Sequence, residues 1–469
     1  MGTSLVWLRD DLRLVDNPAL HAACGRGGKV AVVYILDEQS TGIRPLGGAT
    51  KWWLHKSLAA LDLSLKAIGS TLVLRRGKAF DVVGDLVSEM KVEGVFWNRR
   101  YGSAERAIDG QIKAALTNQG LEVASFHANL LFEPWEIKTG SGTPYKVFTP
   151  FWRACTDRSE PRHPLPASSF IDAVHADSDV LSSWSLLPKP DWAAGLSAEW
   201  APGEDGAERR LAEFCDRGGA GYAVDRDKPA VEATSRLSPH LRFGEISPFR
   251  IWHAIRSVQG GAAEDLAVFR TELGWREFCW QLLYFHPHLA AVNYRRKFDA
   301  FQWQTPSPGE LAAWQQGRTG YPLVDAGMRQ LWQTGWMHNR IRMVVASFLV
   351  KNLLVDWRVG EQWFWDTLVD ADAANNPANW QWVAGSGADA APYFRVFNPI
   401  TQSRKFDPDG AYLRQFVAEL AGLGPKAIHE PWKGPHSQDG NKKYPPPIVE
   451  LAPSRERALD AYAALEDPL

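Results

Sequence analysis

The amino-acid sequence predicts an α/β domain with a Rossmann-like parallel sheet, followed by an all-helical domain. At 469 residues the chain exceeds what one hydrophobic core usually serves, so we expect two domains. Short apolar runs alternate with helical patterns in the first third, and beyond about residue 208 the patterns are helical almost throughout. We predict an α/β domain at 1–132, a linker at 133–207 and a helical domain at 208–469.

The predicted strands are the short apolar runs at 4–8, 30–36, 71–74, 95–97 and 123–126. Between the second and third runs, leucines recur at helical spacing, at Leu54, Leu58, Leu61 and Leu65. A helix between two such strands is typical of a β-α-β unit, which implies a parallel sheet. No G-x-G-x-x-G motif follows these runs, which argues against a dinucleotide fingerprint here.

The segment 133–207 is rich in Pro, Ser, Gly and Trp and has weak periodicity, which indicates a linker. Beyond it, 341–354 is the clearest buried helix. Its apolar residues and one asparagine fall on neighbouring helical turns, at Val344, Val345, Phe348, Leu349 and Asn352.

The composition, 45% apolar and 23% charged, is that of a soluble globular protein. No window has the roughly 18 apolar residues of a membrane span. Charged residues at 9–11 interrupt the start, where a secretory signal needs an apolar run. We therefore expect a protein of the cytosol. The cysteines lack metal-site or disulfide spacing, so we expect buried thiols at Cys24, Cys155, Cys215 and Cys279.

Aromatic residues and positive charge concentrate in the same part of the chain. Twelve of the 22 tryptophans lie at 252–382, and the segment 226–351 holds 16 Lys/Arg against 10 Asp/Glu. The run DADAANNPANWQW at 370–382 adds two acids, two tryptophans and several asparagines. Such a combination suits a site that stacks a flat ring system and holds phosphates.

The motif TSRLSPH at 234–240 combines three hydroxyls with Arg236 just before an expected helix. We predict Ser238 as the N-cap and Pro239 at the first helical position. Exposed amides, hydroxyls and a guanidinium suit a pyrophosphate. A simple capped helix explains the same residues, and this segment alone favours it. Tyr222, just upstream, either covers a ring or packs in the core.

In TELGWRE, Glu272 and Trp275 lie one turn apart on a predicted helix and share a face. The carboxyl is suited to hydrogen-bond a flat substrate that the indole stacks. The alternative is a core tryptophan beside a glutamate paired with an arginine, and it is at least as well supported by this motif alone.

In MHNRIRM at 337–343, arginines enter the predicted buried helix and therefore need buried partners or a bound anion. We expect Asp370 and Asp372 to be the partners of Arg340 and Arg342. We expect His338 to be structural rather than a metal ligand, because no second His or Cys stands at metal spacing.

In eight ordered blocks the chain resembles the DNA photolyase and cryptochrome family. The opening VWLRDDLRLVDNPAL also resembles that family, so the resemblance covers nearly the whole chain. Chance agreement of so many ordered blocks is negligible beside that of a single motif. The blocks are Tyr222, TSRLSPHLRFGEIS, ELGWREF, TGYPLVDAGMRQL, GWMHNRIRMVVASFLVKNLL, DWRVGEQWF, DADAANNPANWQW and DAAPYFRVFNP.

The resemblance implies FAD in the helical domain and a light-harvesting antenna chromophore in the α/β domain. It assigns Arg342 and Asp370 to either side of the isoalloxazine, Asp372 to the ribose or the side of the ring, and Asn376 to the flavin N5. Asn376 is chosen by counting back from Trp380, which leaves Asn375 one residue out of register. The residues assigned to the flavin phosphates are Tyr222, Thr234, Ser235, Arg236, Leu237 and Ser238.

In photolyases the excited, fully reduced flavin gives an electron to a cyclobutane pyrimidine dimer flipped out of the duplex. The ring then splits and the electron returns. The resemblance implies that Trp275 and Trp382 replace the lost stacking and that Glu272 hydrogen-bonds the carbonyl edge of the dimer. The other residues assigned to DNA are Arg226, Arg276, Asn339, Arg340, Met343, Arg395, Arg404 and Lys405.

The family also uses tryptophans to carry electrons from the surface to the flavin. The resemblance assigns this path to Trp380, Trp357 and Trp303. Core packing is the alternative for each, and above all for Trp303. A branch through Trp336, Trp363 or Trp365 stays open.

Within the family we expect a cyclobutane dimer photolyase, most like the bacterial class III branch. The (6-4) enzymes carry histidines where this chain has Asn339 and Met343. Plant cryptochromes typically replace the N5-facing asparagine by aspartate and add a long tail, whereas Asn376 is present here and only a short end follows Tyr444. A cryptochrome-type photoreceptor and a DASH-type photolyase for single-stranded DNA remain the alternatives. A dark flavin oxidoreductase would need a nicotinamide fingerprint, which the sequence lacks.

The antenna is least determined by the sequence. We expect methenyltetrahydrofolate, with a deazaflavin or a second flavin as alternatives. Trp52, Trp53 and Trp97 are expected in the core rather than at a chromophore. The expected partner is UV-damaged DNA, and we expect a monomer without a membrane or metal partner.

Overall fold

The computed structural model describes residues 2–174, 176–217, 219–256, 258, 263–390, 394–433 and 444–465. The chain divides into two compact units. The first unit comprises Met1–Ala220, Ser235–Pro287 and Val369–Asp372. The second unit comprises Gly221–Thr234, His288–Leu368 and Ala373–Leu469. Each unit therefore contains segments that are far apart in the sequence.

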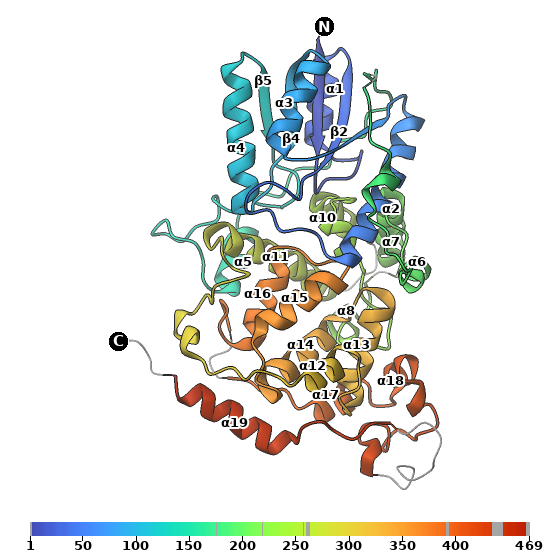
Figure 1. Ribbon diagram of the computed structural model, residues 1–469, viewed down its shortest axis with the longest axis vertical. Helices are drawn as coiled ribbons and strands as arrows, with labels where there is room; N and C mark the ends of the chain where they lie inside the picture. Colours follow the sequence, from blue (N-terminus) through green and yellow to red (C-terminus); the bar gives the residue numbers. More distant parts are fainter. Residues whose placement is uncertain are drawn as a thin grey trace. The chain divides into compact units, whose positions relative to one another are not determined.

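The first unit contains a parallel five-stranded sheet in the order β3-β2-β1-β4-β5, drawn in blue to cyan in Figure 1. The predicted α/β fold and all five predicted strands are confirmed. The fourth strand differs most from its predicted bounds, because the charged residue Glu93 and the glycine Gly94 hide its start in the sequence. The strands are β1 Thr3–Leu8, β2 Val30–Leu36, β3 Leu72–Arg76, β4 Val92–Asn98 and β5 Glu122–Phe126.

Helices follow the strands, as the alternating pattern predicts. The leucine-rich segment forms α2, Gly48–Ala67, and buries the four leucines that predicted it. Helix α1, Pro18–Arg26, begins at Asn17, whose side chain accepts a hydrogen bond from the N–H of Leu20. Helices α3, Ala79–Glu89, and α4, Ser103–Asn118, pack against each other and against the sheet.

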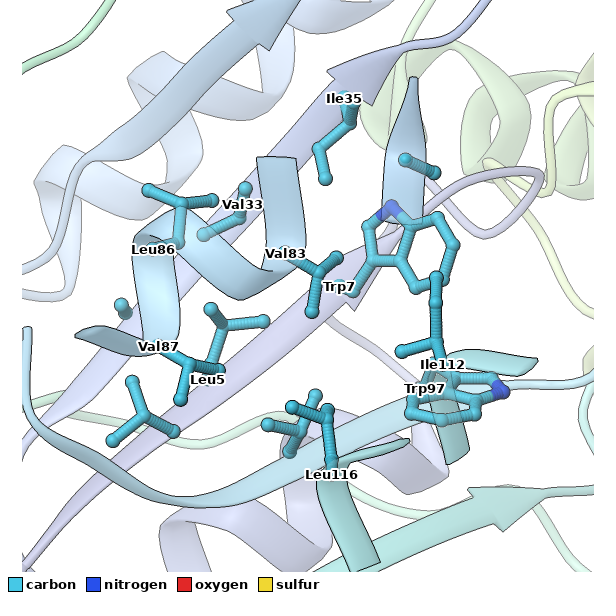
Figure 2. Packing of buried hydrophobic residues seen from close by; sticks show 14 of the residues in the cluster. Leu5, Trp7, Val33, Ile35, Val83, Leu86, Val87, Trp97, Ile112 and Leu116 are labelled. Atoms are coloured by element: carbon cyan, nitrogen blue, oxygen red, sulfur yellow. The ribbon is translucent and has the colours of Figure 1, made fainter. Parts of the chain in front are cut away.

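The core of the first unit lies between the sheet and the helices α3 and α4. Figure 2 shows side chains from alternate strand positions packed against both helices. The rings of Trp7 and Trp97 meet edge to face, with centroids 6.0 Å apart. Burial of each aliphatic side chain in this core contributes about 1.5–3 kcal/mol. The residues of α3 and α4 that pack against the strands are Val83, Leu86, Val87, Ile112 and Leu116.

The stretch 133–207 contains short helices and is packed in the first unit. Its backbone pairs with β2, because the N–H of Val30 donates to Asp172 O at 2.8 Å. Its helices are α5 Phe148–Thr156, η1 Leu181–Trp184 and α6 Ala194–Glu199, and α7 Glu204–Asp216 follows. These helices are too short to show the periodicity from which helices are predicted.

The remaining helices of the first unit are α9 Ser238–Arg242, α10 Pro248–Arg256 and α11 Ala263–Phe285. The predicted N-cap of α9 was wrong by one residue. Leu237 occupies the N-cap, and Ser238 is already helical. Its hydroxyl donates to Asp370 Oδ2 at 2.7 Å, so this tertiary contact replaces the local capping bond.

The described part of the second unit consists of helices and loops. The predicted buried helix forms α14, Asn339–Ser347, and continues as a π-helix, η3, Phe348–Asn352. All five of the residues that predicted it are buried. The other helices are α8 Tyr222–Asp225, η2 Arg296–Ala300, α12 Pro308–Gln315, α13 Pro322–Thr334, α15 Trp357–Thr367, α16 Asn375–Ala384, α17 Pro399–Phe406, α18 Ala411–Phe416, η4 Ala418–Leu420, η5 Pro431–Lys433 and α19 Leu451–Ala463.

All four cysteines are free thiols. Cys155 and Cys279 are buried as expected, whereas Cys24 and Cys215 are partly exposed. None of the described helices is both long and apolar enough to cross a bilayer. Within the described ranges, no cluster of three His, Cys, Asp or Glu residues could hold a metal ion.

A buried carboxyl joins α11 to the loop after β5. Oε2 of Glu277 accepts hydrogen bonds from the backbone N–H groups of Leu131 at 2.8 Å and Phe132 at 3.2 Å. Burial raises the pKa of Glu277 to about 7, although Arg276 and the two N–H groups oppose the rise. The folded protein therefore binds this proton more tightly than the unfolded chain does.

We expect Glu277→Gln to stabilise the protein relative to the wild type as the pH rises. Below pH 4.5 the carboxyl is protonated in both states, and its contribution to stability is lost as the pH rises through about 7. The difference in unfolding free energy between variant and wild type should grow by up to about 3 kcal/mol from pH 5 to pH 8. Urea unfolding at both pH values measures it. Glu264→Gln, at an exposed carboxyl of the same helix, is the control, and a pH-independent difference would contradict the prediction.

Candidate functional site

The first unit brings together two of the segments predicted to bind one ligand. Ser238 contacts Asp370, and Arg242 donates to Ala371 O at 2.9 Å and to Asp10 Oδ1 at 2.7 Å. These bonds hold Val369–Asp372 against α9, although 132 residues separate Ser238 from Asp370. Asp372 is buried in the same segment.

The predicted phosphate-binding segment exposes hydroxyls. Ser238 is exposed, Thr234 and Ser235 are partly exposed, and Leu237 is buried. Arg236 has a left-handed backbone, with φ 53°, and its guanidinium is paired with Glu199. Hydroxyls ahead of a helix are suitable donors for phosphate oxygens, whereas a phosphate would share Arg236 with this glutamate.

The ring of Trp275 is stacked on Phe148 from α5. The two ring centroids are 3.7 Å apart and the planes differ by 8°. Phe278 meets both rings edge to face. Gly274 leaves room for the nearby ring of Trp152, because a Cβ there would lie 2.5 Å from that ring. The half-exposed indole therefore has a rigid aromatic support on one face.

Two neighbours of Trp275 on α11 differ in their surroundings. Glu272, one turn before it, is partly exposed on the same helix. Arg276 donates to Asn129 O at 2.8 Å, and its side chain is only 14% exposed. Glu272 is thus partly accessible, while Arg276 ties α11 to the loop after β5.

On α16 of the second unit, the side chain of Asn376 has a fixed orientation. Its Nδ2 donates to Glu361 O at 3.0 Å and to Glu361 Oε1 at 2.8 Å. A backbone carbonyl only accepts hydrogen bonds, so the amide nitrogen must face Glu361. The amide oxygen of Asn376 consequently faces away from Glu361 and can accept a hydrogen bond from a ligand.

Trp380, one turn further along α16, is 2% exposed. Its ring meets Phe364 and Trp314 edge to face, with centroids 4.9 and 6.3 Å away. Its Nε1 has no hydrogen-bond partner among the described residues. Gly360 is required beside it, because a Cβ there would lie 2.1 Å from the ring.

The other tryptophans assigned to electron transfer lie at different depths. Trp357 is fully buried and its Nε1 donates to Asn293 Oδ1 at 2.9 Å. Trp303 is partly exposed and packs on Phe301 with centroids 4.3 Å apart. Trp314 was not singled out in the sequence, because it lies in the apolar run LAAW, which reads as ordinary core. Of the branch candidates, Trp336 and Trp365 are buried, and Trp363 stacks on a neighbouring indole.

At the start of α14, the predicted partners of Arg340 were wrong. Its guanidinium binds Asp227 through both carboxylate oxygens, each at 2.7 Å, rather than Asp370 or Asp372. The sequence could not show this ion pair, because Asp227 lies 113 residues from Arg340 along the chain.

Four other residues of this segment are placed as follows. His338 is confirmed as structural, since its Nδ1 accepts from the N–H of Arg340 and caps the helix. Burial lowers the pKa of His338 to about 4, so the ring is neutral near pH 7. Arg342 donates to Met337 O at 2.7 Å. Asn339 is exposed and Met343 is partly exposed.

The remaining residues assigned to DNA all belong to the second unit. Arg226 lies 5.6 Å from the centroid of the buried Tyr222 ring. Trp382 is partly exposed, and its Nε1 donates to Asp389 O at 3.1 Å. Arg395, Arg404 and Lys405 are exposed, and Arg404 is paired with a glutamate of the same unit.

Comparison with known proteins places the whole chain in one family. The family model described as DNA photolyase matches residues 4–169, and that of the FAD binding domain of DNA photolyase matches residues 269–464. The chain is 53% identical over 472 residues to deoxyribodipyrimidine photo-lyase of Agrobacterium fabrum (strain C58), covering 98% of each chain. It is 40% identical to deoxyribodipyrimidine photo-lyase of Escherichia coli (strain K12), covering 99% of each.

The chain belongs to the DNA photolyase and cryptochrome family. A solved bacterial class III photolyase from Agrobacterium tumefaciens superposes with a TM-score of 0.95 at 52% identity, over 99% of this chain and 98% of the other. An archaeal photolyase from Sulfolobus tokodaii, described with two FAD molecules, superposes with a TM-score of 0.83 at 32% identity, over 98% and 99%. The resemblance found in the sequence blocks is confirmed.

The residues of this photolyase-family chain fit FAD. The amide oxygen of Asn376, which faces away from Glu361, suits a protonated ring nitrogen, and the hydroxyls of Thr234 and Ser235 suit phosphate oxygens, whereas the hydroxyl of Ser238 is donated to Asp370. The FAD-binding match at 269–464 includes Asn376. FAD is therefore consistent with both the family and the side chains.

We expect Phe148→Leu to weaken binding of DNA that carries a thymine dimer. Without the stacked ring, Trp275 loses a support that contributes about 1 kcal/mol, which corresponds to roughly fivefold in Kd. Fluorescence anisotropy with a labelled oligonucleotide measures it. Phe170→Leu, at a phenylalanine that is 67% exposed, should leave Kd unchanged. Equal affinities for the wild type and Phe148→Leu would show that the stack does not position Trp275.

Proposed function

We propose that the protein is a deoxyribodipyrimidine photo-lyase that repairs cyclobutane pyrimidine dimers in DNA with light. One observation carries the proposal for this photolyase-family chain. Glu272 lies one helical turn from the partly exposed Trp275, one face of which is stacked on Phe148. A supported indole suits a flipped base, and the carboxyl suits the polar edge of that base.

We propose that FAD is held by Tyr222, the segment 234–238, Arg342, Asp370, Asp372 and Asn376. When bound and reduced, FAD supplies the light-excited electron for ring splitting. Asn376, oriented by Glu361, accepts a hydrogen bond from the flavin ring. The hydroxyls of Thr234 and Ser235 would donate to phosphate oxygens, and Ser238 would do so when its single O–H turns from Asp370 to the phosphate.

The proposed lesion contacts divide into ring, edge and backbone contacts. Trp275 and Trp382 stack the dimer, and Glu272 hydrogen-bonds its carbonyl edge, where negative charge develops after electron uptake. Phosphate contacts position the strand. The further proposed DNA contacts are Arg226, Arg276, Asn339, Arg340, Met343, Arg395, Arg404 and Lys405.

The proposal includes the domain organisation and the antenna. We assign 1–132 to an antenna-chromophore domain, 133–207 to an interdomain connection and 208–469 to FAD and DNA binding. Methenyltetrahydrofolate is the proposed antenna, and the two FAD molecules of the archaeal photolyase make a second flavin the alternative. We propose a class III enzyme, monomeric, in the cytoplasm where its DNA substrate lies.

The test is an absorption spectrum of the purified protein, followed by blue light on a thymine-dimer oligonucleotide. Flavin bands and light-dependent loss of dimers are expected, whereas no repair alongside flavin photochemistry would favour a cryptochrome. Glu272→Ala should keep its FAD and repair several-fold fewer dimers per absorbed photon, because a hydrogen bond to a charged group contributes about 1.5–3 kcal/mol. Glu264→Ala, at an exposed glutamate of the same helix, is the control. Undiminished yield in Glu272→Ala would remove its assigned role.

We propose that Trp380, Trp357 and Trp303 carry electrons to oxidised flavin, and expect Trp380→Phe to abolish its photoreduction. Phenylalanine keeps the packing but is far harder to oxidise than an indole. The flavin absorbance under blue light with an external reductant measures this. In Trp314→Phe, which changes an aromatic neighbour of Trp380, the flavin should still be photoreduced. Normal photoreduction in Trp380→Phe would mean that another tryptophan donates first.

A further inference from the structure

The second unit contains a basic hollow that the assignments above do not explain. It encloses about 410 Å³, part of which is open to solvent. No Asp or Glu occurs among the described residues that line it. Three cations from distant parts of the chain converge there beside aromatic rings: Arg295, Lys351 and Arg395, with Trp382, Phe394 and Tyr462.

Lys351 is the buried cation of this basic hollow. Its residue is 1% exposed, and its Nζ donates to Ala384 O at 2.8 Å and lies 2.9 Å from the centroid of the Phe394 ring. The described part of the chain offers it no carboxylate within ion-pair distance. Burial lowers the pKa of Lys351 well below its usual range, because an ammonium without a counter-ion costs several kcal/mol to bury. An anion in the hollow would therefore favour the charged form of this lysine.

The local backbone around Lys351 is also unusual. The lysine lies in the π-helix η3, between helix α14 and the turn before α15. π-Helical turns are rare and occur frequently at functional sites. The acceptor Ala384 is the last residue of α16, so the lysine interacts with the negative end of that helix.

The three cations lie at different depths. Arg295 is partly exposed and donates to Ala390 O at 3.1 Å, and Arg395 is exposed. Trp382 and Tyr462 supply flat apolar surface beside them. Cations at several depths exclude a metal ion and favour an oxyanion with an attached organic group. A sugar-phosphate unit of DNA has this chemistry, and Trp382 and Arg395 are already proposed DNA contacts.

We propose that the basic hollow binds a phosphate group of the DNA strand, with Lys351 and Arg295 as its contacts. This inference rests on the proposed function. The contact is to the backbone, so it contributes equally to damaged and undamaged sequences. It also contributes to the salt dependence of binding, because each neutralised phosphate releases counter-ions.

The test compares Arg295→Gln, Lys351→Met and the control Arg296→Gln. Arg296 is adjacent, carries the same charge and pairs with Asp299, but does not line the hollow. Duplex binding is measured at several salt concentrations, with and without a thymine dimer. In each of the variants Arg295→Gln and Lys351→Met, the slope of log K against log[salt] should be shallower than the wild-type slope by about 0.9. Arg296→Gln should keep the wild-type slope.

The outcomes separate this inference from the proposed function. A wild-type slope in Arg295→Gln, with normal repair per absorbed photon at saturating DNA, would overturn the phosphate site and leave the photo-lyase proposal intact. Absence of repair in the wild type would overturn the photo-lyase proposal, while the slopes would still test the hollow. The FAD content of each purified variant shows whether it has folded. If Lys351→Met does not fold, the salt dependence of Arg295→Gln alone tests the phosphate site.

Discussion

Burial of indole rings is the constraint on which both units depend. Trp7, Trp53, Trp97, Trp314 and Trp357 are fully buried, and each carries one N–H that loses water on folding. For three of them the acceptor is specific: Glu245 for Trp53, the carbonyl of Val345 for Trp314 and Asn293 for Trp357. The positions of these rings therefore determine where hydrogen-bond acceptors must lie in the interior.

Trp380 differs from Trp53, Trp314 and Trp357 in its hydrogen bonding. Its Nε1 has no hydrogen-bond partner in the described part of the chain, and a glycine provides room for its ring. The same is true of Nε1 of Trp7 in the core of the first unit. A buried indole without an acceptor gains packing but no hydrogen bond, so the redox role proposed for Trp380 rests on the family and not on the missing acceptor.

Several charged groups in or near the interior are paired within their own unit. Arg340 binds Asp227, and His240 pairs with Glu245, which also accepts the N–H of Trp53. Lys351 differs, because its side-chain nitrogen contacts the carbonyl of Ala384 and the ring of Phe394, and no carboxylate among the described residues pairs with it. Charges that are already paired hold the fold together, whereas the incompletely satisfied ones point to ligands.

The sequence alone determined the parallel sheet, the helical second half and the family, because alternation, helical spacing and ordered motifs are local properties of the chain. It also placed Trp52, Trp53 and Trp97 correctly in the core. Only the tertiary structure decided that Ser238 bonds Asp370, that Asp227 pairs with Arg340 and that Phe148 supports Trp275. Those partners lie more than 100 residues apart, so no local spacing could reveal them.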